Sequence, residues 1–540
     1  MFINDKAMIE KPIIEKPSED IGGQKNGVGK KENLKQRAYL NTVSSMMDYT
    51  ANRLTGLFVN PFVIEGLGTS LFGIWQMLGQ FTGYVNIADT RSSQVLKWTV
   101  AQKKDVASVE ELRKDAGAAF VVMLLVMPVI LIAGSFIAWY APYITHAEKA
   151  HYDLIRITCS LLIFSVLVFK FFELFEAVLR GMNLTFKRMG VRAIIVILGG
   201  GLKVLAIIRG YGLIGLAVVQ LFDTLLIGTS YYIVVKRNVE WFGFAKPNRS
   251  NIFRFGKLSA WYLADAGANM VNTNSDKILL GIIAGPVTVA YYTLTKFIPA
   301  ALQGLINRVI LGIMPGIGKL LGLKEYDKVN RVRKKINSVS LLLTTAFGVT
   351  VIIFNQSFLN AWVGKEHFAG HTANALIMIM TIQDTFVKND AYIISATLDI
   401  KKKVFLTLIS GVLFAGFGVV LVSKMGVAGL CLSFMISRLF LFIGQRRVLA
   451  ALMKTETQTA FNINYRPFVT AILMLGIAMW LATKTGSIGI YQVILFAPAV
   501  FVISLPLFYF SGLSKAERLE LQQIITSIKF FKSDSGFSKN

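Results

Sequence analysis

Apolar stretches recur along the chain from residue 39 to residue 511, and short polar segments separate them. Most of these stretches reach the length of about 20 residues that a helix needs to cross the hydrocarbon layer of a bilayer. The pattern therefore predicts an all-α polytopic membrane protein with about fourteen transmembrane helices. The predicted spans are 39–62, 71–95, 116–139, 151–179, 187–208, 211–235, 257–283, 286–317, 336–358, 371–397, 403–422, 425–445, 467–483 and 489–511.

The composition agrees with this pattern. Hydrophobic residues make up 54% of the 540 residues, charged residues make up 16%, and the mean hydropathy is +0.56. Cys159 and Cys431 lie in separate apolar stretches, which argues against a disulfide framework or a thiol metal site. Motifs of hydrolytic or metal-dependent catalysis, such as His-Glu-x-x-His, do not occur in the sequence. We therefore expect a protein that is not an enzyme and holds no cofactor.

Lys and Arg residues are distributed very unevenly between the polar segments. The segments on one side of the predicted membrane hold 42 of these residues, against 5 in the turns on the other side. Because cytoplasmic loops carry an excess of Lys and Arg, this bias places both termini in the cytoplasm. We interpret the basic runs as topology signals beside anionic membrane lipids and not as nucleic-acid-binding sites, although the net charge is +26.

Two halves of the chain resemble each other. Residues 184–188 match 398–402, and 212–216 match 426–430, both at an offset of 214. At an offset of 217, four residues of the first half have identical partners in the second: Asp48 with Asp265, Asn52 with Asn269, Gly68 with Gly285, and Arg91 with Arg308. These matches predict two pseudo-symmetric six-helix lobes, related by an axis along the membrane normal, with the substrate site between them.

This repeat predicts the organisation of the whole chain. A flexible cytoplasmic tail (1–38) precedes an N-lobe with helices 1–6 (39–236) and a C-lobe with helices 7–12 (252–450). Helices 13 and 14 (467–511) and a second cytoplasmic tail (512–540) follow.

Polar residues occupy matched positions in the first helix of each lobe. Asp48 and Asn52 share one helical face, and Asp265 and Asn269 repeat the arrangement. We expect these four side chains to line a cavity, and the alternative is that they join neighbouring helices by hydrogen bonds. A desolvated carboxyl group is also the simplest site for a coupling ion, H⁺ or Na⁺, and Asp48 is the first candidate.

Cations inside the predicted spans give the strongest indication of function. Arg53, Arg91, Lys296 and Arg308 all fall within apolar helices, where a charge persists only if it faces a bundle interior or a watery cavity. A positive cavity requires an anionic occupant, and guanidinium groups suit phosphate oxygens. We expect these four residues to bind the substrate of an anion transporter. The alternative for Arg91 and Arg308 is snorkelling to the inner interface.

Other features of the spans look structural. Lys170 and Glu173, and likewise Asp384 and Lys388, have the spacing of intrahelical ion pairs. The triple glycine 199–201 is expected to interrupt helix 5 and to serve as a hinge.

Two short motifs resemble a known family. Residues 67–75 (Leu-Gly-Thr-Ser-Leu-Phe-Gly-Ile-Trp) resemble the opening motif of the polysaccharide transporter family, and residues 84–89 resemble that family's apolar segment ending in Asp-Leu-Gly. Here Thr90 and Arg91 replace the Leu-Gly. With the span count and the repeat, the chain is similar to Wzx-type O-antigen flippases of the multidrug/oligosaccharidyl-lipid/polysaccharide flippase superfamily.

This resemblance implies a V-shaped, MATE-like pair of lobes with helices 1, 2, 7 and 8 around a central cavity. It also implies movement of an undecaprenyl-diphosphate-linked oligosaccharide across the cell inner membrane, with other glycan-assembly proteins as candidate partners. Helices 13 and 14 would form a groove for the lipid tail, as in lipid II flippases.

Several alternatives remain at this point. Within the superfamily they are a multidrug/cation antiporter, for which a cationic cavity is unsuited, and a lipid II flippase. Outside it they are a membrane glycan polymerase or ligase, which usually needs a large external loop, and a non-transporting scaffold, which leaves the duplicated charges unexplained.

The charge distribution yields a first prediction. A single cysteine at Lys328, in a background without Cys159 and Cys431, should resist an impermeant thiol reagent in intact cells and react after permeabilisation, because the loop is cytoplasmic. A cysteine at Lys365 in the same background should react in intact cells. Labelling at position 328 from outside would overturn the topology.

Overall fold

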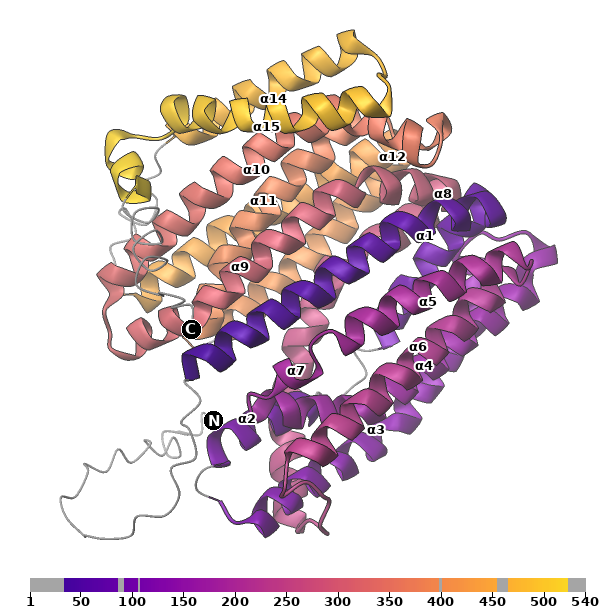
Figure 1. Cartoon of the computed structure of the whole chain (residues 1–540), viewed down its shortest axis with the longest axis vertical. Coiled ribbons are helices and arrows are strands. Elements are labelled where there is room, and N and C mark those ends of the chain that lie inside the picture. Colours follow the sequence, from indigo (N-terminus) through magenta and orange to yellow (C-terminus); the bar gives the residue numbers. More distant parts are fainter. Residues whose placement is uncertain (1–33, 86–91, 105–106, 398–400, 454–464, 523–540) are drawn as a thin grey trace, which may run out of the picture.

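The computed structural model describes residues 34–85, 92–104, 107–397, 401–453 and 465–522, apart from the side chains of residues 34–39 and of several positions between 258 and 319 (Figure 1). All regular secondary structure in these ranges is helical. The α-helices are α1 (Leu34–Val85), α2 (Ser92–Lys103), α3 (Val109–Ile144), α4 (Tyr152–Gly181), α5 (Val191–Ile208), α6 (Gly212–Asn238), α7 (Arg249–Asn274), α8 (Asp276–Thr295), α9 (Phe297–Gly322), α10 (Tyr326–Trp362), α11 (His371–Ala396), α12 (Lys401–Leu452), α14 (Arg466–Thr485) and α15 (Ile490–Gly512).

Ten helices of the described residues are long and apolar enough to cross a membrane, or eleven if the bent helix α9 is counted. Two of them, α1 and α12, have 52 residues each and contain one non-helical glycine, Gly68 and Gly426. A straight helix of that length would extend about 78 Å, far more than a bilayer, so each is a pair of helices. In α12 the chain reverses, since the Ser410 hydroxyl donates to the carbonyl of Ser437. The predicted all-α polytopic architecture is confirmed.

The matched glycines of the repeat adopt matched backbone conformations. Gly68 has φ 77° and ψ 164°, and its partner Gly285 has φ 81° and ψ 166°. Gly212 and Gly426, the pair at the other offset, both have φ 54°. A positive φ is inexpensive only for glycine, so the same sharp turn is built at equivalent points of both halves. The two lobes are therefore pseudo-symmetric in backbone as well as in sequence.

Two predicted spans are broken by turns that apolar patterning does not reveal. The span 257–283 was expected as one helix, but α7 ends at Asn274 and α8 begins at Asp276. The span 286–317 is divided at Lys296. Both breaks lie beside one cluster, in which the Lys296 ammonium group and the Asp276 carboxylate are 2.8 Å apart. The helices are therefore interrupted at or next to the two residues, Asp276 and Lys296, that contact each other through their side chains.

The expectation that residues 199–201 interrupt a helix is wrong. Helix α5 runs unbroken from Val191 to Ile208. The glycines instead permit close packing: a Cβ atom at Gly199 would lie 2.0 Å from the Asp223 carboxylate, and one at Gly200 would lie 2.3 Å from the Thr55 methyl group of α1. Absent side chains let neighbouring helices approach, which is their usual role in membrane bundles.

Two groups of helices form the body of the molecule, with α1 between them (Figure 1). Helices α2–α6 gather on one side, and α9–α12 on the other. Helix α1 contacts α5 of the first group and α8, which leads into the second. The start of α7 packs on the first group, where Arg254 pairs with Asp115 at 2.8 Å, while α7 also contacts α12. Helices α1, α7 and α8 thus connect the lobes.

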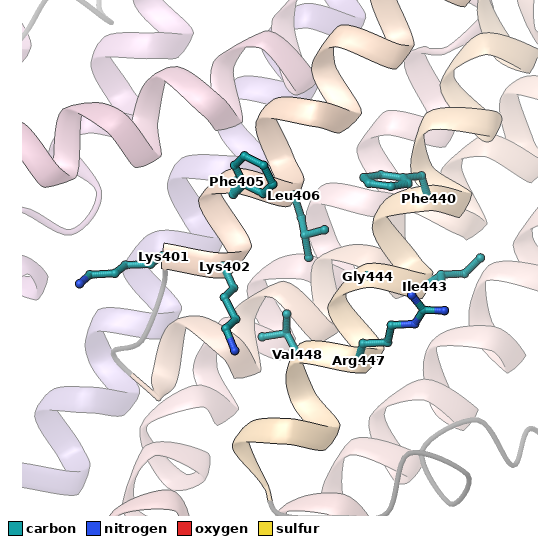
Figure 2. A pocket seen from close by; sticks show the side chains of 9 residues that line it. All are labelled: Lys401, Lys402, Phe405, Leu406, Phe440, Ile443, Gly444, Arg447 and Val448. Atoms are coloured by element: carbon teal, nitrogen blue, oxygen red, sulfur yellow. The ribbon is translucent and has the colours of Figure 1, made fainter. Parts of the chain in front are cut away.

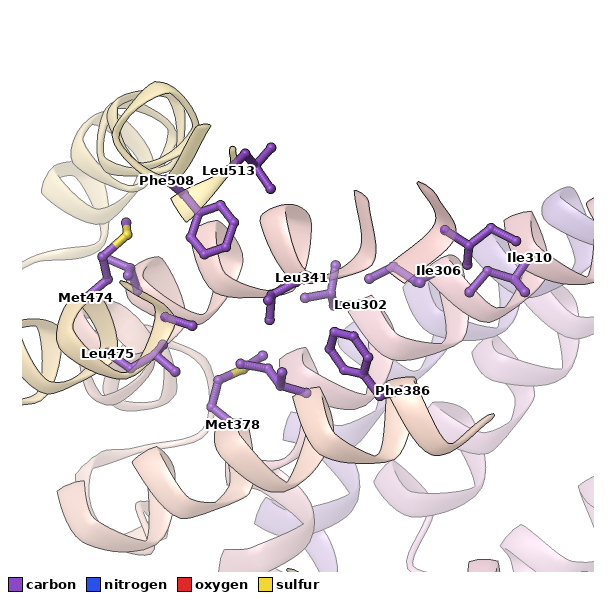
Figure 3. Close-up of a cluster of buried hydrophobic side chains, with 14 of the residues drawn as sticks. Leu302, Ile306, Ile310, Leu341, Met378, Phe386, Met474, Leu475, Phe508 and Leu513 are labelled. Carbon is purple, nitrogen blue, oxygen red and sulfur yellow. The ribbon is translucent and has the colours of Figure 1, made fainter. Parts of the chain in front are cut away.

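The last two helices extend the C-lobe. Both α14 and α15 pack on α10. One apolar core joins them to α9, α10 and α11, and Met474 and Phe508 lie in the same cluster as Leu341 and Met378 (Figure 3). Each of these four side chains is buried, which stabilises the assembly of the C-lobe with its appended pair.

Helices α1 and α8 approach each other closely at Gly73, in the motif that carries the family resemblance. A Cβ atom at this position would lie 1.9 Å from the carbonyl oxygen of Pro286, just after the turn at Gly285. Since the obstacle is backbone, a larger residue has to push the two helices apart. Gly79 in the same helix has open space around it.

Gly73→Ala should therefore destabilise the fold by about 1–3 kcal/mol, the usual cost of overpacking. Gly79→Ala is the matched control and should be neutral or slightly stabilising, because alanine favours helix. Thermal unfolding of the purified variants in detergent measures both. Equal stability of the two variants would show that the α1–α8 contact is not tight.

Candidate functional site

A buried ion cluster holds Asp48. Its Oδ2 atom lies 2.9 Å from a guanidinium nitrogen of Arg188, and the other terminal nitrogen of Arg188 lies 3.2 Å from the Glu176 carboxylate of α4. The three residues are 4–7% exposed. Arg188 ends a short 3₁₀ turn, which is fixed because Asn41 of α1 accepts a hydrogen bond from the backbone of Phe186. Arg188 thus supplies the charge that neutralises Asp48.

Two arginines from different lobes meet at one aromatic ring. The guanidinium carbons of Arg53 and Arg308 lie 5.2 Å and 4.6 Å from the ring centroid of Tyr49. The Tyr49 hydroxyl donates to the carbonyl of Ala301 at 2.6 Å, which ties α1 to α9. Arg308 in turn donates to the carbonyl of Ser45 at 3.1 Å. Cation–π attraction holds both guanidinium groups near the ring.

The close approach of α1 and α9 at this ring depends on a glycine. A Cβ atom at Gly304 would lie 2.1 Å from the hydroxyl oxygen of Tyr49. Within the described part of the chain, neither Arg53 nor Arg308 has a carboxylate within ion-pair distance. Both are only partly buried.

A second group of polar residues lies at the break between α7 and α8. The Lys296 ammonium group pairs with Asp276 at 2.8 Å and lies 2.6 Å from the Tyr292 hydroxyl. Lys277 crosses to α1, where it donates to Gln76 at 2.9 Å. The charge of Lys296 is therefore balanced by a carboxylate, whereas Lys277 contacts a neutral amide. Arg53 interacts electrostatically with both Lys277 and Arg308, and the carboxylates of Asp276 and Asp48 act on the same two cations with the opposite sign.

The structure brings together some of the predicted site residues. Arg53, Arg308 and Asp48 lie on or against the same stretch of α1, and Asn52 donates to the backbone of Asp48 at 2.7 Å. Lys296 lies in the neighbouring cluster with Asp276. Arg91 and the side chains of Asp265 and Asn269 are outside the described residues. Their assignment to the cavity stays a prediction.

Sequence reasoning missed three participants. Tyr49 precedes Arg53 by four residues, so the helical spacing could have indicated the ring beneath the guanidinium group. The sequence assigns no site role to Arg188, although its side chain is only 4% exposed. Glu176 lies four residues before Arg180, with which it pairs at 2.9 Å, so the helical spacing could have indicated this buried acid.

The predicted intrahelical pairs are confirmed. Lys170 lies 2.7 Å from Glu173, and Lys388 lies 2.7 Å from Asp384. Arg438 adds a second cation to Asp384 at 3.0 Å, which gives that buried arginine a structural role.

Comparison with known proteins identifies the family. Residues 39–321, just over half of the chain, match the family described as "Polysaccharide biosynthesis protein". The chain belongs to this family. One relative, the putative O-antigen transporter of Escherichia coli (strain K12), is 30% identical over 105 residues. That alignment covers 19% of this chain and 24% of the relative, so the chain spans about a quarter of the relative's length.

Solved structures of the same fold are transporters and flippases. The lipid II flippase MurJ, in an inward closed conformation, matches with a TM-score of 0.66 and 15% identity, covering 86% of this chain and 98% of that one. An inward-facing multidrug resistance MATE family transporter of the MOP superfamily matches with a TM-score of 0.60 and 15% identity, covering 78% and 99%. The family member is therefore a multi-pass membrane protein with a MATE-like fold.

The buried cluster yields a stability prediction. Arg188→Gln should cost about 3–5 kcal/mol, because it leaves the buried Asp48 carboxylate without its cation, whereas Glu176 keeps Arg180 at 2.9 Å. Lys187→Gln is the control, since Lys187 is exposed and such changes alter stability by about 0.5 kcal/mol or less. Thermal unfolding in detergent compares the two. A loss no greater in Arg188→Gln than in Lys187→Gln would contradict the buried pair.

Proposed function

We propose that this family member is a flippase that moves an undecaprenyl-diphosphate-linked oligosaccharide, a repeat unit of O-antigen, capsule or exopolysaccharide, from the inner to the outer leaflet. The observation that supports this proposal is the group of cations where α1 meets α8 and α9. Arg53, Lys277 and Arg308 lie there without a carboxylate partner in the described part of the chain. Cations without a direct ion-pair contact, at the place where two lobes meet, suit an anion that passes between the lobes.

A diphosphate fits the chemistry of these residues. Two guanidinium groups offer paired N–H donors that match phosphate oxygens, and the Lys277 ammonium group acts as a point charge. Tyr49 keeps the two arginines beside one another although they come from different helices. Separation of α1 from α9 would expose both guanidinium groups to the substrate. The other contacts within each lobe would hold Arg53 and Arg308 in place.

Alternating access requires elements that can move. The turns at Gly68 and Gly285 have equivalent backbone conformations in the two lobes, beside the α1–α8 contact. We propose that the lobes rock about this contact, so that the site between them faces each leaflet in turn. In the proposed topology, the protein lies in the cell inner membrane with both termini in the cytoplasm. Other glycan-assembly proteins are proposed as partners on either side.

A lipid II flippase is the second candidate, favoured by the similarity in fold to MurJ. Its substrate also carries a diphosphate, so the same group of cations could bind the substrate of either candidate. A multidrug/cation antiporter fits less well, because a cationic drug would be repelled by Arg53, Lys277 and Arg308. Matching the flipped glycan to the cell's own repeat unit would distinguish the first two candidates.

Energy coupling is a further part of the proposal. Asp48 is 7% exposed, and its Oδ1 atom accepts no hydrogen bond from the described residues. We propose that Asp48 exchanges a proton or a sodium ion during the cycle. Exchange would compete with the ion pair to Arg188, and would therefore link ion binding to the position of the 3₁₀ turn after α4.

The proposed function is tested by flipping of a lipid-diphosphate-linked oligosaccharide in proteoliposomes. The double variant Arg53→Ala/Arg308→Ala should lower the rate about tenfold or more, because each lost contact to a charged group costs about 1.5–3 kcal/mol. Arg209→Ala is the control, as Arg209 is exposed at a turn away from the site. Wild-type rates in the stably folded double variant would overturn the role of the two arginines.

The same assay with imposed proton or sodium gradients tests coupling. Asp48→Asn should abolish the response to the gradient and retain substrate binding. If the wild-type protein ignores both gradients, or the Asn variant responds normally, Asp48 is a structural residue and the coupling proposal is wrong.

A further inference from the structure

A groove of about 600 Å³ lies between the two halves of α12, near the end of the hairpin where both halves terminate (Figure 2). All of its lining comes from this one helical hairpin. The lining residues are Lys401, Lys402, Phe405, Leu406, Phe440, Ile443, Gly444, Arg447 and Val448. None of them belongs to α1, α8 or α9, so the groove is separate from the cation group between the lobes.

The wall of the groove is apolar and faces outward. Phe405 is 65% exposed and Ile443 is 38% exposed, and in a transmembrane hairpin such side chains face lipid. Gly444 gives the groove its depth, because a Cβ atom there would lie 2.7 Å from the side chain of Leu406. An apolar surface of this kind suits an acyl chain.

Two cations flank the groove at its polar end. Lys402 and Arg447 come from different halves of α12 and lie on either side of Val448, whereas Lys401 points away from Arg447 (Figure 2). Both residues are exposed, and neither has an ion-pair partner among the residues that the structure describes. The ammonium and guanidinium groups can bind a phosphate, and the apolar wall beside them can contact the hydrocarbon chain to which the phosphate is attached.

The repeat shows that this arrangement is particular to the C-lobe. Residues 187 and 188 of the N-lobe match residues 401 and 402 at the offset of 214. In the N-lobe, Arg188 is buried against Asp48 and Glu176. Its equivalent in the C-lobe, Lys402, lies instead on the exposed groove. The same basic position thus completes a buried ion cluster in one lobe and faces the surrounding membrane in the other.

We infer that the groove binds an anionic glycerophospholipid, with the phosphate between Lys402 and Arg447 and an acyl chain along Phe405, Leu406 and Ile443. Basic pockets between transmembrane helices on the cytoplasmic side are suited to anionic head groups. The assignment to the cytoplasmic leaflet rests on the proposed topology. The phospholipid acts as a bound component of the C-lobe and is distinct from the transported lipid.

Native mass spectrometry of the full-length protein in detergent tests this site, with phosphatidylglycerol, phosphatidylcholine and a polyprenyl diphosphate as probes. Lys402→Gln/Arg447→Gln should weaken phosphatidylglycerol binding about thirtyfold, given about 1 kcal/mol for each basic residue near anionic lipid. Binding of phosphatidylcholine should be weak and unchanged. The conservative variant Lys402→Arg/Arg447→Lys should retain phosphatidylglycerol.

The control is Lys236→Gln/Arg237→Gln, which removes two exposed cations at the end of α6. Unchanged phosphatidylglycerol binding in the groove variant, or an equal loss in the control, would overturn the proposal. Selective loss of the polyprenyl diphosphate would also overturn it and would assign the groove to the substrate. Because the assay measures binding alone, its outcome is independent of the flipping experiments on Arg53 and Arg308.

Discussion

A charge inside a bilayer has to be neutralised by a partner, because the hydrocarbon layer offers no water to solvate it. This constraint explains the internal architecture of both lobes. Helix α4 carries Lys170 with Glu173, and α11 carries Asp384 with Lys388. In the C-lobe, Arg333 binds Asp390 through two contacts of 2.7 Å. Such fully partnered groups fix helix positions, and removal of one partner is far more costly than replacement of both.

Because of the same constraint, cations that have no carboxylate partner are informative. At the contact between the lobes, Arg53 and Arg308 are held by the ring of Tyr49, and Lys277 by an amide. Aromatic and amide groups orient a cation without cancelling its charge. The ion pairs inside the lobes thus contrast with the cations where the lobes meet, and the proposed function rests on this contrast.

The two lobes have the same backbone turns but different ion pairs. Gly68 and Gly285 repeat one turn, because the positive φ restricts the position to glycine. Glu176 and Asp390 are both buried acids, and they are equivalent in the repeat because they lie 214 residues apart. Their arginine partners, Arg188 and Arg333, do not lie at equivalent positions. Backbone turns are conserved between the halves by steric necessity, whereas an ion pair can be rebuilt with any cation that reaches the carboxylate.

The sequence by itself determined the features that depend on local or repeated pattern. These are the helical spans, the duplication, and the intrahelical pairs such as Lys170 with Glu173, since hydropathy and helical spacing act over a few residues. Only the tertiary structure decided which remote groups meet. It joined Asp48 to Arg188, placed Tyr49 between Arg53 and Arg308, and turned 199–201 from an expected hinge into a packing surface. The reason is that packing across helices brings together residues 140 or more positions apart, and no periodicity along the chain records that distance.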